Sequence, residues 1–167
     1  DIIEKNKNYD WDYIELSLNP NITFDIIKKN KDKNWNWFYI SNNPNINMDI
    51  VNNNPDEKWN YSGLSFNPNV TIEYIMENKD KPWNWFWAIS KNPNITMEII
   101  EKYPNNPWNW DYISCNPNIT MDIIEKNPNK SWDWKYLSWS SNINYDFIEQ
   151  HIDKDWDWEA LCMNQNI

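Results

Sequence analysis

The residues of this chain with the most chemical potential are one histidine and two cysteines. His151 is the only histidine, which argues against Ser–His, Cys–His and multi-histidine metal sites. At the end of a predicted helix, its expected role is structural, because a cation there suits the helix dipole. Cys115 and Cys162 lie two repeats apart, about 20 Å at roughly 10 Å per helix layer, which is too far for a disulfide. We expect two inert thiols in a reducing compartment.

A second candidate is a regular row of acids, which one could interpret as cation ligands. Its members are Asp25, Asp49, Glu73, Glu98, Asp122 and Asp146. A spacing of about 10 Å per repeat is too wide for one ion to bridge two of them, and an acid at a helix start is favoured by the dipole alone. With Gly63 as the only glycine, a glycine-rich phosphate loop is impossible. We therefore expect no catalytic residues, no metal and no cofactor, and hence no enzyme.

Six Asn-x-Ser/Thr sequences could also accept a glycan. They begin at Asn21, Asn60, Asn69, Asn94, Asn118 and Asn129. Four of them are by-products of a capping threonine or its equivalent, and the cysteine content does not suggest secretion. Glycosylation is therefore not expected.

Composition excludes several classes of partner. The chain has 167 residues, a formal charge of −10 and no arginine, whereas nucleic-acid binders need a basic surface. Even ten consecutive apolar residues do not occur, so no membrane span is expected. Aromatic residues make up 17 % of the chain, which argues against disorder despite 32 asparagines. We expect a folded, acidic protein that binds neither nucleic acid nor membrane.

Two motifs recur along the whole chain. The first is Asn-Pro-Asn-Ile-Thr, which begins at Asn19, Asn43, Asn67, Asn92 and Asn116 and degenerates at Ser140 and Asn164. The second is an aromatic box of the form aromatic-x-aromatic: Trp11/Tyr13, Trp35/Trp37, Trp59/Tyr61, Trp83/Trp85, Trp108/Trp110, Trp132/Trp134 and Trp156/Trp158. The first tryptophans are 24 residues apart, except for one spacing of 25. Residues 1–167 are therefore predicted to be one tandem-repeat solenoid of seven repeats.

Each repeat is predicted to contain two short helices. In the copy that starts at Asn118, Thr120 caps a first helix that ends near Asn127. The second would run from Trp132 to about Ser138. A strand is disfavoured there because one of its faces would mix acids, variable residues and leucine. On a helix, the second aromatic, the Leu/Ile and the Ser form one stripe. The first tryptophan should pack on the first helix or the next repeat.

The fold class is accordingly all-α, an α-solenoid of seven two-helix repeats of about 24 residues. Helices of two turns are unstable alone and need stacking. The alternative is a leucine-rich-repeat-like solenoid, because Leu64-Ser65-Phe66-Asn67 is similar to part of that motif.

Two details of the repeats give sharper expectations. The first asparagine of each Asn-Pro-Asn is expected to cap a helix in the left-handed conformation, and the second to bond between neighbouring loops. The fourth copy has one extra residue in its second helix, within Trp83–Ser90. Such insertions are usually absorbed as a π-bulge, so we predict one between Trp85 and Ser90 that displaces Phe86 or Trp87 outward.

Together the Asn-Pro-Asn-Ile-Thr and Trp-Asp-Trp blocks resemble the asparagine-rich tandem repeats in proteins of giant amoeba-infecting viruses, the mimivirus group. The resemblance covers the full chain and implies a viral origin, a repeat-scaffold role and a location in the virion or the infected host's cytoplasm. It supplies no catalytic residues. The last two copies depart from the pattern, with Ser141 and Gln165 in place of proline and Asn144 in place of threonine.

The leading functional hypothesis is a non-catalytic scaffold for protein–protein interaction. Aromatic residues at positions that vary between repeats are the expected partner-binding residues: Phe38, Tyr39, Phe66, Trp87, Tyr112, Tyr136 and Trp139. They could equally pack between repeats. The charge of −10 favours a lysine-rich protein partner.

Two other functions stay open. The chain begins in the phase of a first helix, and neither end has the polar cap that solenoids require, so it would be a segment of a longer array or an uncapped unit. In the second case copies of the chain would stack head to tail into filaments or a particle component. A carbohydrate-binding module would need several box tryptophans exposed in a row.

Overall fold

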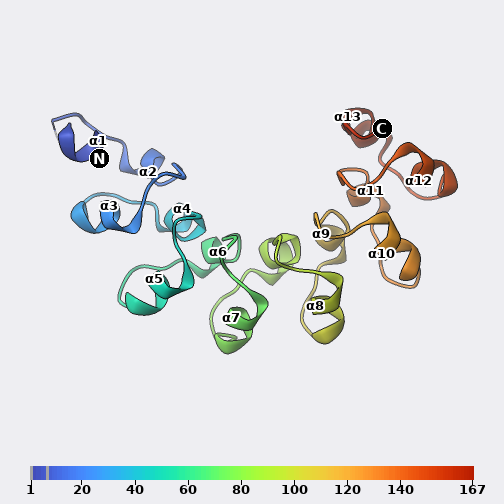
Figure 1. Ribbon diagram of the computed structural model, residues 1–167, viewed down its shortest axis with the longest axis horizontal. Helices are drawn as coiled ribbons and strands as arrows, with labels where there is room; N and C mark the ends of the chain where they lie inside the picture. The colour runs from blue at the N-terminus through green and yellow to red at the C-terminus, as the bar shows by residue number, and fades with distance from the viewer. Residues whose placement is uncertain (1, 7) are drawn as a thin grey trace. The chain divides into compact units, whose positions relative to one another are not determined.

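The computed structural model describes residues 2–6 and 8–167, which form short helices throughout (Figure 1). The chain divides into two compact units, residues 1–83 and 84–167. No β-strand occurs among the described residues, so the protein is all-α and repeat-like. The leucine-rich-repeat alternative is wrong, because each of its repeats would contribute a strand.

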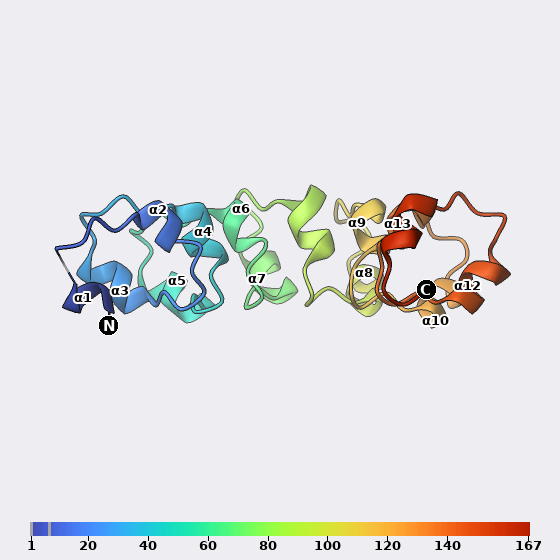
Figure 2. The same ribbon diagram turned by 90° about the horizontal axis from the view of Figure 1, so that it is seen from above.

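The first unit contains seven helices in its described part. They are α1 (Ile2–Lys5), α2 (Tyr13–Leu16), α3 (Phe24–Lys29), α4 (Trp37–Asn42), α5 (Met48–Asn53), α6 (Tyr61–Leu64) and α7 (Ile72–Glu77). In Figures 1 and 2, α2, α4 and α6 form one row, and α1, α3, α5 and α7 form another.

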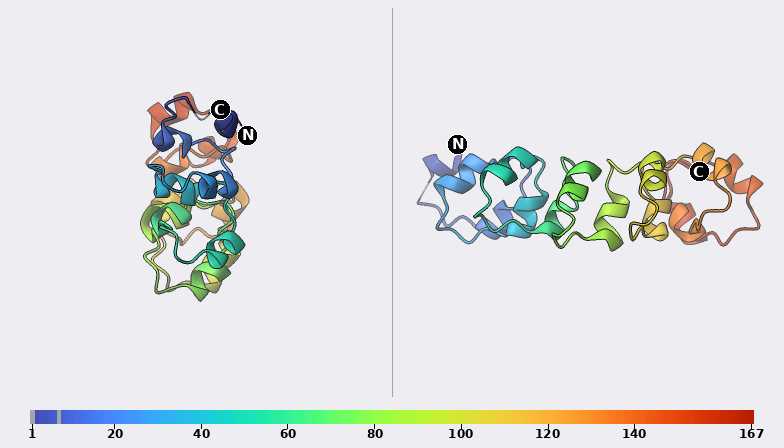
Figure 3. Two further views of the ribbon diagram at one scale, coloured as in Figure 1. Left: turned by 90° about the vertical axis from the view of Figure 1, so that its left-hand side faces the viewer. Right: turned by 90° about the horizontal axis from the view of Figure 1, so that it is seen from below.

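The second unit repeats this two-row arrangement. Its helices are η1 (Trp85–Ile89), α8 (Met97–Lys102), α9 (Trp110–Ser114), α10 (Met121–Lys126), α11 (Trp134–Leu137), α12 (Tyr145–Gln150) and α13 (Trp158–Met163). One row holds η1, α9, α11 and α13, and the other holds α8, α10 and α12 (Figures 1 and 3). We call helices α1, α3, α5, α7, α8, α10 and α12 first helices. The helices that follow a box tryptophan, which are α2, α4, α6, η1, α9, α11 and α13, are called second helices.

First helices begin and end as the sequence predicts. The Thr120 hydroxyl accepts a hydrogen bond from the Ile123 N–H at 3.4 Å, and Asn127 forms the C-cap of α10. Asn144, which replaces the threonine at α12, accepts from the Phe147 N–H at 2.9 Å. Thr23 is the exception, since it makes no side-chain capping bond.

Second helices begin two residues later than predicted, at Trp134 rather than Trp132 in α11. The cause is an N-cap in the middle of each box, whose side-chain oxygen accepts one or two backbone N–H bonds of the first turn. These caps are Asp12, Asn36, Asn60, Asn84, Asn109, Asp133 and Asp157. The box tryptophan before each cap is therefore outside the helix.

Each repeat buries the same aliphatic positions. In the Asn118 copy these are Ile119, Ile124 and Leu137, which are 1 %, 3 % and 0 % exposed. They come from the loop, the first helix and the second helix, so one small core joins all three. In the predicted stripe of the second helix, Leu137 and Ser138 are fully buried and the second aromatic, Trp134, is half-buried.

The box tryptophans bind their own first helix and the preceding repeat. The Trp132 indole N–H donates to the Asn127 carbonyl at 2.8 Å, at the end of α10. Its ring meets Trp110 of the preceding repeat edge to face, with centroids 5.2 Å apart. Contact with the first helix is confirmed, but the neighbouring ring belongs to the preceding repeat and not to the next one.

Within each unit, a buried serine at the end of one second helix bonds to the N-cap of the next second helix. The Ser114 hydroxyl donates to the Trp110 carbonyl at 2.7 Å and accepts from the Asp133 N–H at 2.9 Å. The same relay joins Ser17 to Asn36, Ser41 to Asn60, Ser90 to Asn109 and Ser138 to Asp157. Within each unit, the N-cap amides of Asn36, Asn60, Asn109, Asp133 and Asp157 are thus satisfied by the preceding repeat.

The first asparagine of the Asn-Pro-Asn motif does not act as predicted. No non-glycine residue in the described part of the chain has a positive φ, so the left-handed cap is wrong. Instead the Asn67 carboxamide oxygen accepts from the Asn69 N–H at 2.8 Å. Its amide group donates to the carbonyls of Ser41, Asn43 and Ile46 of the preceding repeat at 2.8, 3.0 and 3.0 Å.

The second asparagine forms the ladder that the sequence predicts. The Asn69 amide donates to Pro44 at 2.8 Å and to Ile46 at 3.0 Å, both in the preceding loop. Asn45, Asn118 and Asn142 make the equivalent pair of bonds, and Asn166 makes one.

The extra residue of the fourth copy produces the predicted π-helix. η1 spans Trp85–Ile89, and the Ile89 N–H donates to the Asn84 carbonyl five residues earlier, at 3.0 Å. Phe86 and Trp87 are 70 % and 46 % exposed, while Ile89 keeps its place in the core. The insertion is therefore taken up by displacing aromatic side chains outward.

Gly63 lies where two second helices approach most closely. A Cβ atom at this position would be 2.3 Å from the Phe38 carbonyl oxygen, so α4 and α6 would have to separate. We expect Gly63→Ala to lower the free energy of unfolding by about 1–3 kcal/mol, the range of overpacked sites. Urea unfolding measures it, with Ala88→Gly in another second helix as the reference for helix propensity. An unchanged midpoint in Gly63→Ala would contradict this packing.

Candidate binding surface

Most of the predicted partner-binding residues lie on the second helices, at the second and third helical positions or just after the buried serine. These positions point away from the aliphatic core and can therefore vary. Three of the seven lie in the first unit and four lie in the second.

The group in the first unit is packed among its own members. The Phe38 ring meets Tyr39 at 5.4 Å and Phe66 at 6.0 Å, both edge to face. All three side chains are half-buried. They fit the packing alternative better than they fit an open surface.

The group in the second unit forms a row across three repeats. The Phe86 ring lies 6.1 Å from Tyr112, and Tyr112 lies 5.3 Å from Tyr136, both edge to face. Trp139 is 59 % exposed just beyond α11. We call Phe86, Trp87, Tyr112, Tyr136 and Trp139 the aromatic strip.

Phe86 is the member of the strip that the site prediction missed. The signal was present in the inserted residue, because a π-helix shifts the register of its outward side chains by one position. Exposed aromatic area of this size is unusual for a surface that contacts only water, since aromatics are enriched where partners bind.

Acids border the strip near its centre. The pKa of Tyr136 is raised because its hydroxyl shares a hydrogen bond with Tyr112, and the charges of Asp111 and Asp133 act in the same direction. The carboxylates also make this part of the strip negative. Lys135 is paired with Asp155 at 3.3 Å, so its charge is partly neutralised.

The predicted acid row lies at the starts of the first helices and is exposed. Asp25 pairs with Lys28 at 3.1 Å, and Asp122 pairs with Lys126. No cluster of three or more potential metal ligands occurs among the described residues. The acids of the row therefore lie in the first turns of helices, where the helix dipole favours a negative charge.

The asparagines of two glycosylation sequences are engaged in the inter-repeat ladder. The amide nitrogens of Asn69 and Asn118 each donate to two carbonyls of the preceding loop. A glycan on that nitrogen would remove a donor and collide with the loop, so glycosylation of these two is incompatible with the fold.

His151 lies at the C-cap of α12, as predicted. Both cysteines are free thiols. Cys115 is half-buried and Cys162 is exposed. Burial raises the pKa of the Cys115 thiol, and the nearby Lys91 offsets part of that effect.

The raised pKa of Cys115 predicts slow alkylation. In Cys162→Ser, iodoacetamide at pH 8 should modify the remaining Cys115 several-fold more slowly in the folded protein than in guanidinium, because only the thiolate reacts. Mass spectrometry gives both rates. Equal rates would contradict the burial of this thiol.

Box tryptophans do not form an exposed row. Of the twelve, all in the described part, Trp158 alone is exposed, while Trp35, Trp83, Trp132 and Trp156 are buried. The geometry that a carbohydrate-binding module requires is therefore not present. No helix in the described part is both long and apolar enough to span a membrane.

Comparison of the chain with models of protein families, with curated proteins and with solved structures finds no match in any of the three.

Proposed function

We propose that this protein is a non-catalytic scaffold that binds a protein partner through the aromatic strip of the second unit. The observation that carries the proposal is the outward displacement of Phe86 and Trp87 by η1, next to the continuous row Phe86–Tyr112–Tyr136. Exposed aromatic rings add little to the stability of a fold, so accommodating the insertion does not by itself explain why Phe86 and Trp87 are aromatic. The viral origin implied by the sequence stays a prediction.

The charge distribution favours a basic partner. Asp111 and Asp133 lie at the strip, and the whole chain carries −10. A segment with both lysine and apolar side chains would place ammonium groups on the carboxylates and aliphatic groups on the rings. Such complementarity also speeds association at low salt.

A synthetic peptide of alternating lysine and leucine provides the test, with its glutamate–leucine counterpart as the charge-reversed control. We expect fluorescence anisotropy to show saturable binding of the lysine peptide only. The triple variant Phe86→Ala/Trp87→Ala/Trp139→Ala should weaken that binding at least tenfold.

The matched control is Tyr9→Ala, which removes an aromatic ring of the first unit that is as exposed as Phe86 and should leave binding unchanged. If the triple variant stays folded by circular dichroism and binds as well as the wild type, the strip is not the contact surface. Equal binding of both peptides would exclude the charge argument.

A second candidate function is end-to-end association of copies, and one surface favours it. A cavity of about 560 Å³ is lined mainly by apolar side chains that include Tyr145, Ile152, Trp158 and Ile167. In the preceding repeat, Trp134 occupies the place of Trp158 and is covered edge to face by Trp156 at 5.0 Å. Trp158 is 55 % exposed.

We propose that a first helix of a second copy covers this face in repeat register, as successive repeats do within each unit. Sedimentation velocity should then show concentration-dependent association that Trp158→Glu abolishes and Trp139→Ala does not. A wild-type monomer at all concentrations would rule out this second function and leave the first untouched.

A further inference from the structure

Lysine side chains recur at the turns between first and second helices, and two of them lie close together in the second unit. At one position of this turn, lysine places its ammonium over the second box aromatic of the preceding repeat. The pairs are Lys33–Tyr13, Lys81–Tyr61, Lys130–Trp110 and Lys154–Trp134, at 5.7–5.9 Å. The other three turns carry Tyr9, Glu57 and Asn106 there. Lys130 and Lys154 are thus the pair that sits on adjacent turns of one unit.

These two lysines line the same cavity, which has a volume of about 310 Å³. Its apolar lining comes from Ile124, Pro128, Trp132 and Trp134. His151 and Glu125 complete the charged and polar lining. Pockets for small molecules combine an apolar wall with a few converging polar groups, and this volume is at the lower end of their range.

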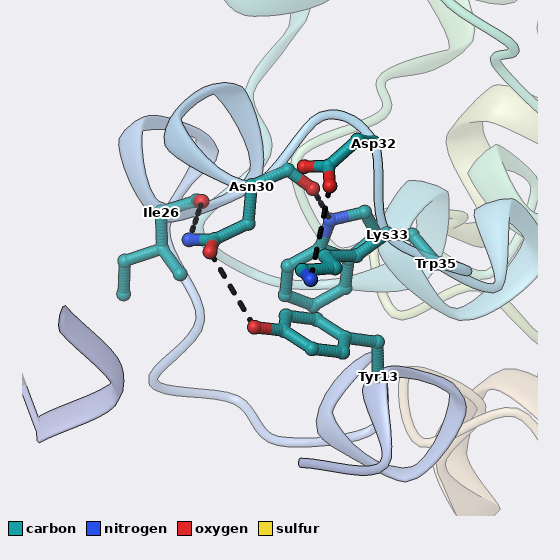
Figure 4. Close-up of polar contacts among 6 residues, drawn as sticks. All are labelled: Tyr13, Ile26, Asn30, Asp32, Lys33 and Trp35. Atoms are coloured by element: carbon teal, nitrogen blue, oxygen red, sulfur yellow. Dashed lines mark hydrogen bonds and ion pairs between the residues drawn. The ribbon is translucent and has the colours of Figure 1, made fainter. Parts of the chain in front are cut away.

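Figure 4 shows how the equivalent turn is built in the first unit. There Asn30 is buried, its amide donates to the Ile26 carbonyl at 3.0 Å, and its oxygen accepts from the Tyr13 hydroxyl at 3.4 Å. The Trp35 indole N–H donates to the Asn30 backbone carbonyl at 2.9 Å. The asparagine therefore fills the turn and satisfies its polar groups internally.

At the cavity, His151 takes the place of this asparagine. Its backbone carbonyl still accepts from the Trp156 indole at 2.9 Å, so the turn itself is unchanged. The imidazole instead lies against Phe147 at 4.5 Å and Trp134 at 5.3 Å between ring centroids. It brings an N–H donor to the cavity in place of an internally bonded amide.

The charges at the cavity favour an anion. Lys130 and Lys154 bring two positive charges against one lining carboxylate, that of Glu125, and His151 adds an N–H donor. Lys154 also pairs at 3.2 Å with Asp153, whose side chain is 73 % exposed and therefore well screened. In a chain of net charge −10 such a concentration of donors is not explained by the overall composition.

We propose that this cavity binds a small carboxylate that has an aromatic or other apolar body. The carboxylate accepts charge-assisted hydrogen bonds from the lysine and histidine N–H groups, and the body lies against the indoles of Trp132 and Trp134. A free organic acid and the C-terminal residue of a peptide share this chemistry. The proposal is independent of the aromatic strip.

Because His151 is the only histidine, its imidazole signals in NMR spectra report on this cavity alone. Phenylacetate probes the free acid, and an N-acetylated Gly-Gly-Phe peptide probes the C-terminal source. Phenylacetamide and the amidated peptide are the neutral controls. We expect saturable shifts with a Kd of about 1 mM or tighter for at least one carboxylate.

The matched variant is Lys130→Asn, because asparagine stands at the equivalent position 106. It should weaken binding of the preferred carboxylate about tenfold while circular dichroism and the thermal midpoint stay as in the wild type. Tighter binding of phenylacetate identifies a free acid, and tighter binding of the peptide identifies a C-terminus. Failure of both carboxylates to shift the imidazole signals below about 10 mM, or equal shifts by the neutral amides, overturns the proposal.

Discussion

Replacing Trp132 by alanine is expected to lower the free energy of unfolding by about 3–5 kcal/mol. The indole is 8 % exposed and joins three parts of the structure. It donates a hydrogen bond to the end of α10, it packs on Trp110 of the preceding repeat, and it precedes the N-cap of α11. A thin repeat has little other core to compensate for a cavity of this size.

Urea unfolding followed by circular dichroism measures the loss, with Trp139→Ala as the matched control. Trp139 is 59 % exposed, so its removal should cost less than about 1 kcal/mol. Trp132→Phe keeps a ring but removes the donor, and we expect an intermediate loss. Equal stability of Trp132→Ala and Trp139→Ala would contradict the assignment of box tryptophans to the core.

Asn67→Ala is expected to destabilise the first unit by about 3 kcal/mol. The side chain is fully buried, and its amide donates to three carbonyls of the preceding repeat. The carbonyls of Asn43 and Ile46 each keep another donor, so Asn67→Ala leaves only the Ser41 carbonyl without this partner. A buried acceptor without a partner costs about 1–3 kcal/mol, and loss of the local turn to Asn69 adds to that cost.

Asn19→Ala separates the local from the inter-repeat contribution. The Asn19 side chain is exposed and accepts from the Asn21 N–H at 2.9 Å, the same local turn that Asn67 makes with Asn69. We expect Asn19→Ala to cost under about 1 kcal/mol. A similar loss in both variants would mean that the local turn, and not the contact between repeats, makes this asparagine important.

Periodic features were predictable from the sequence because they depend on spacing alone. The second helix of each repeat follows from a stripe at helical intervals, which is Trp134, Leu137 and Ser138 in the Asn118 copy. The π-helix follows from one added residue in a helix whose core positions cannot move. Both are confirmed.

Features set by contacts between repeats were not predictable in the same way. Local preference suggested a left-handed cap for Asn67, but the carbonyls of the preceding repeat offer its amide better partners than the local chain does. The packing direction of the box tryptophan was unpredictable for the same reason, because no local rule tells whether Trp132 packs on the preceding or the following repeat.

One missed feature did have a signal. An Asp or Asn occupies the middle of every box, which is the residue class that caps helices. If this Asp or Asn is taken as the N-cap, the sequence predicts second helices that begin at Trp134 rather than at Trp132. For the site, variation between the repeats selected Trp87, Tyr112, Tyr136 and Trp139, which lie in the strip with Phe86. It could not distinguish them from Phe38 and Phe66, which pack against each other.

The central claim is that, within each unit, a repeat is joined to the preceding one by a hydrogen bond from its N-cap amide to a buried serine hydroxyl. Native-state amide hydrogen exchange by NMR tests it most directly, because an N-cap amide is otherwise open to water. We expect slow exchange at Asn36, Asn60, Asn109, Asp133 and Asp157, and acceleration at Asp133 in Ser114→Ala while Asp157 stays slow. Exchange of these five amides at the rate of an unstructured peptide would contradict the account.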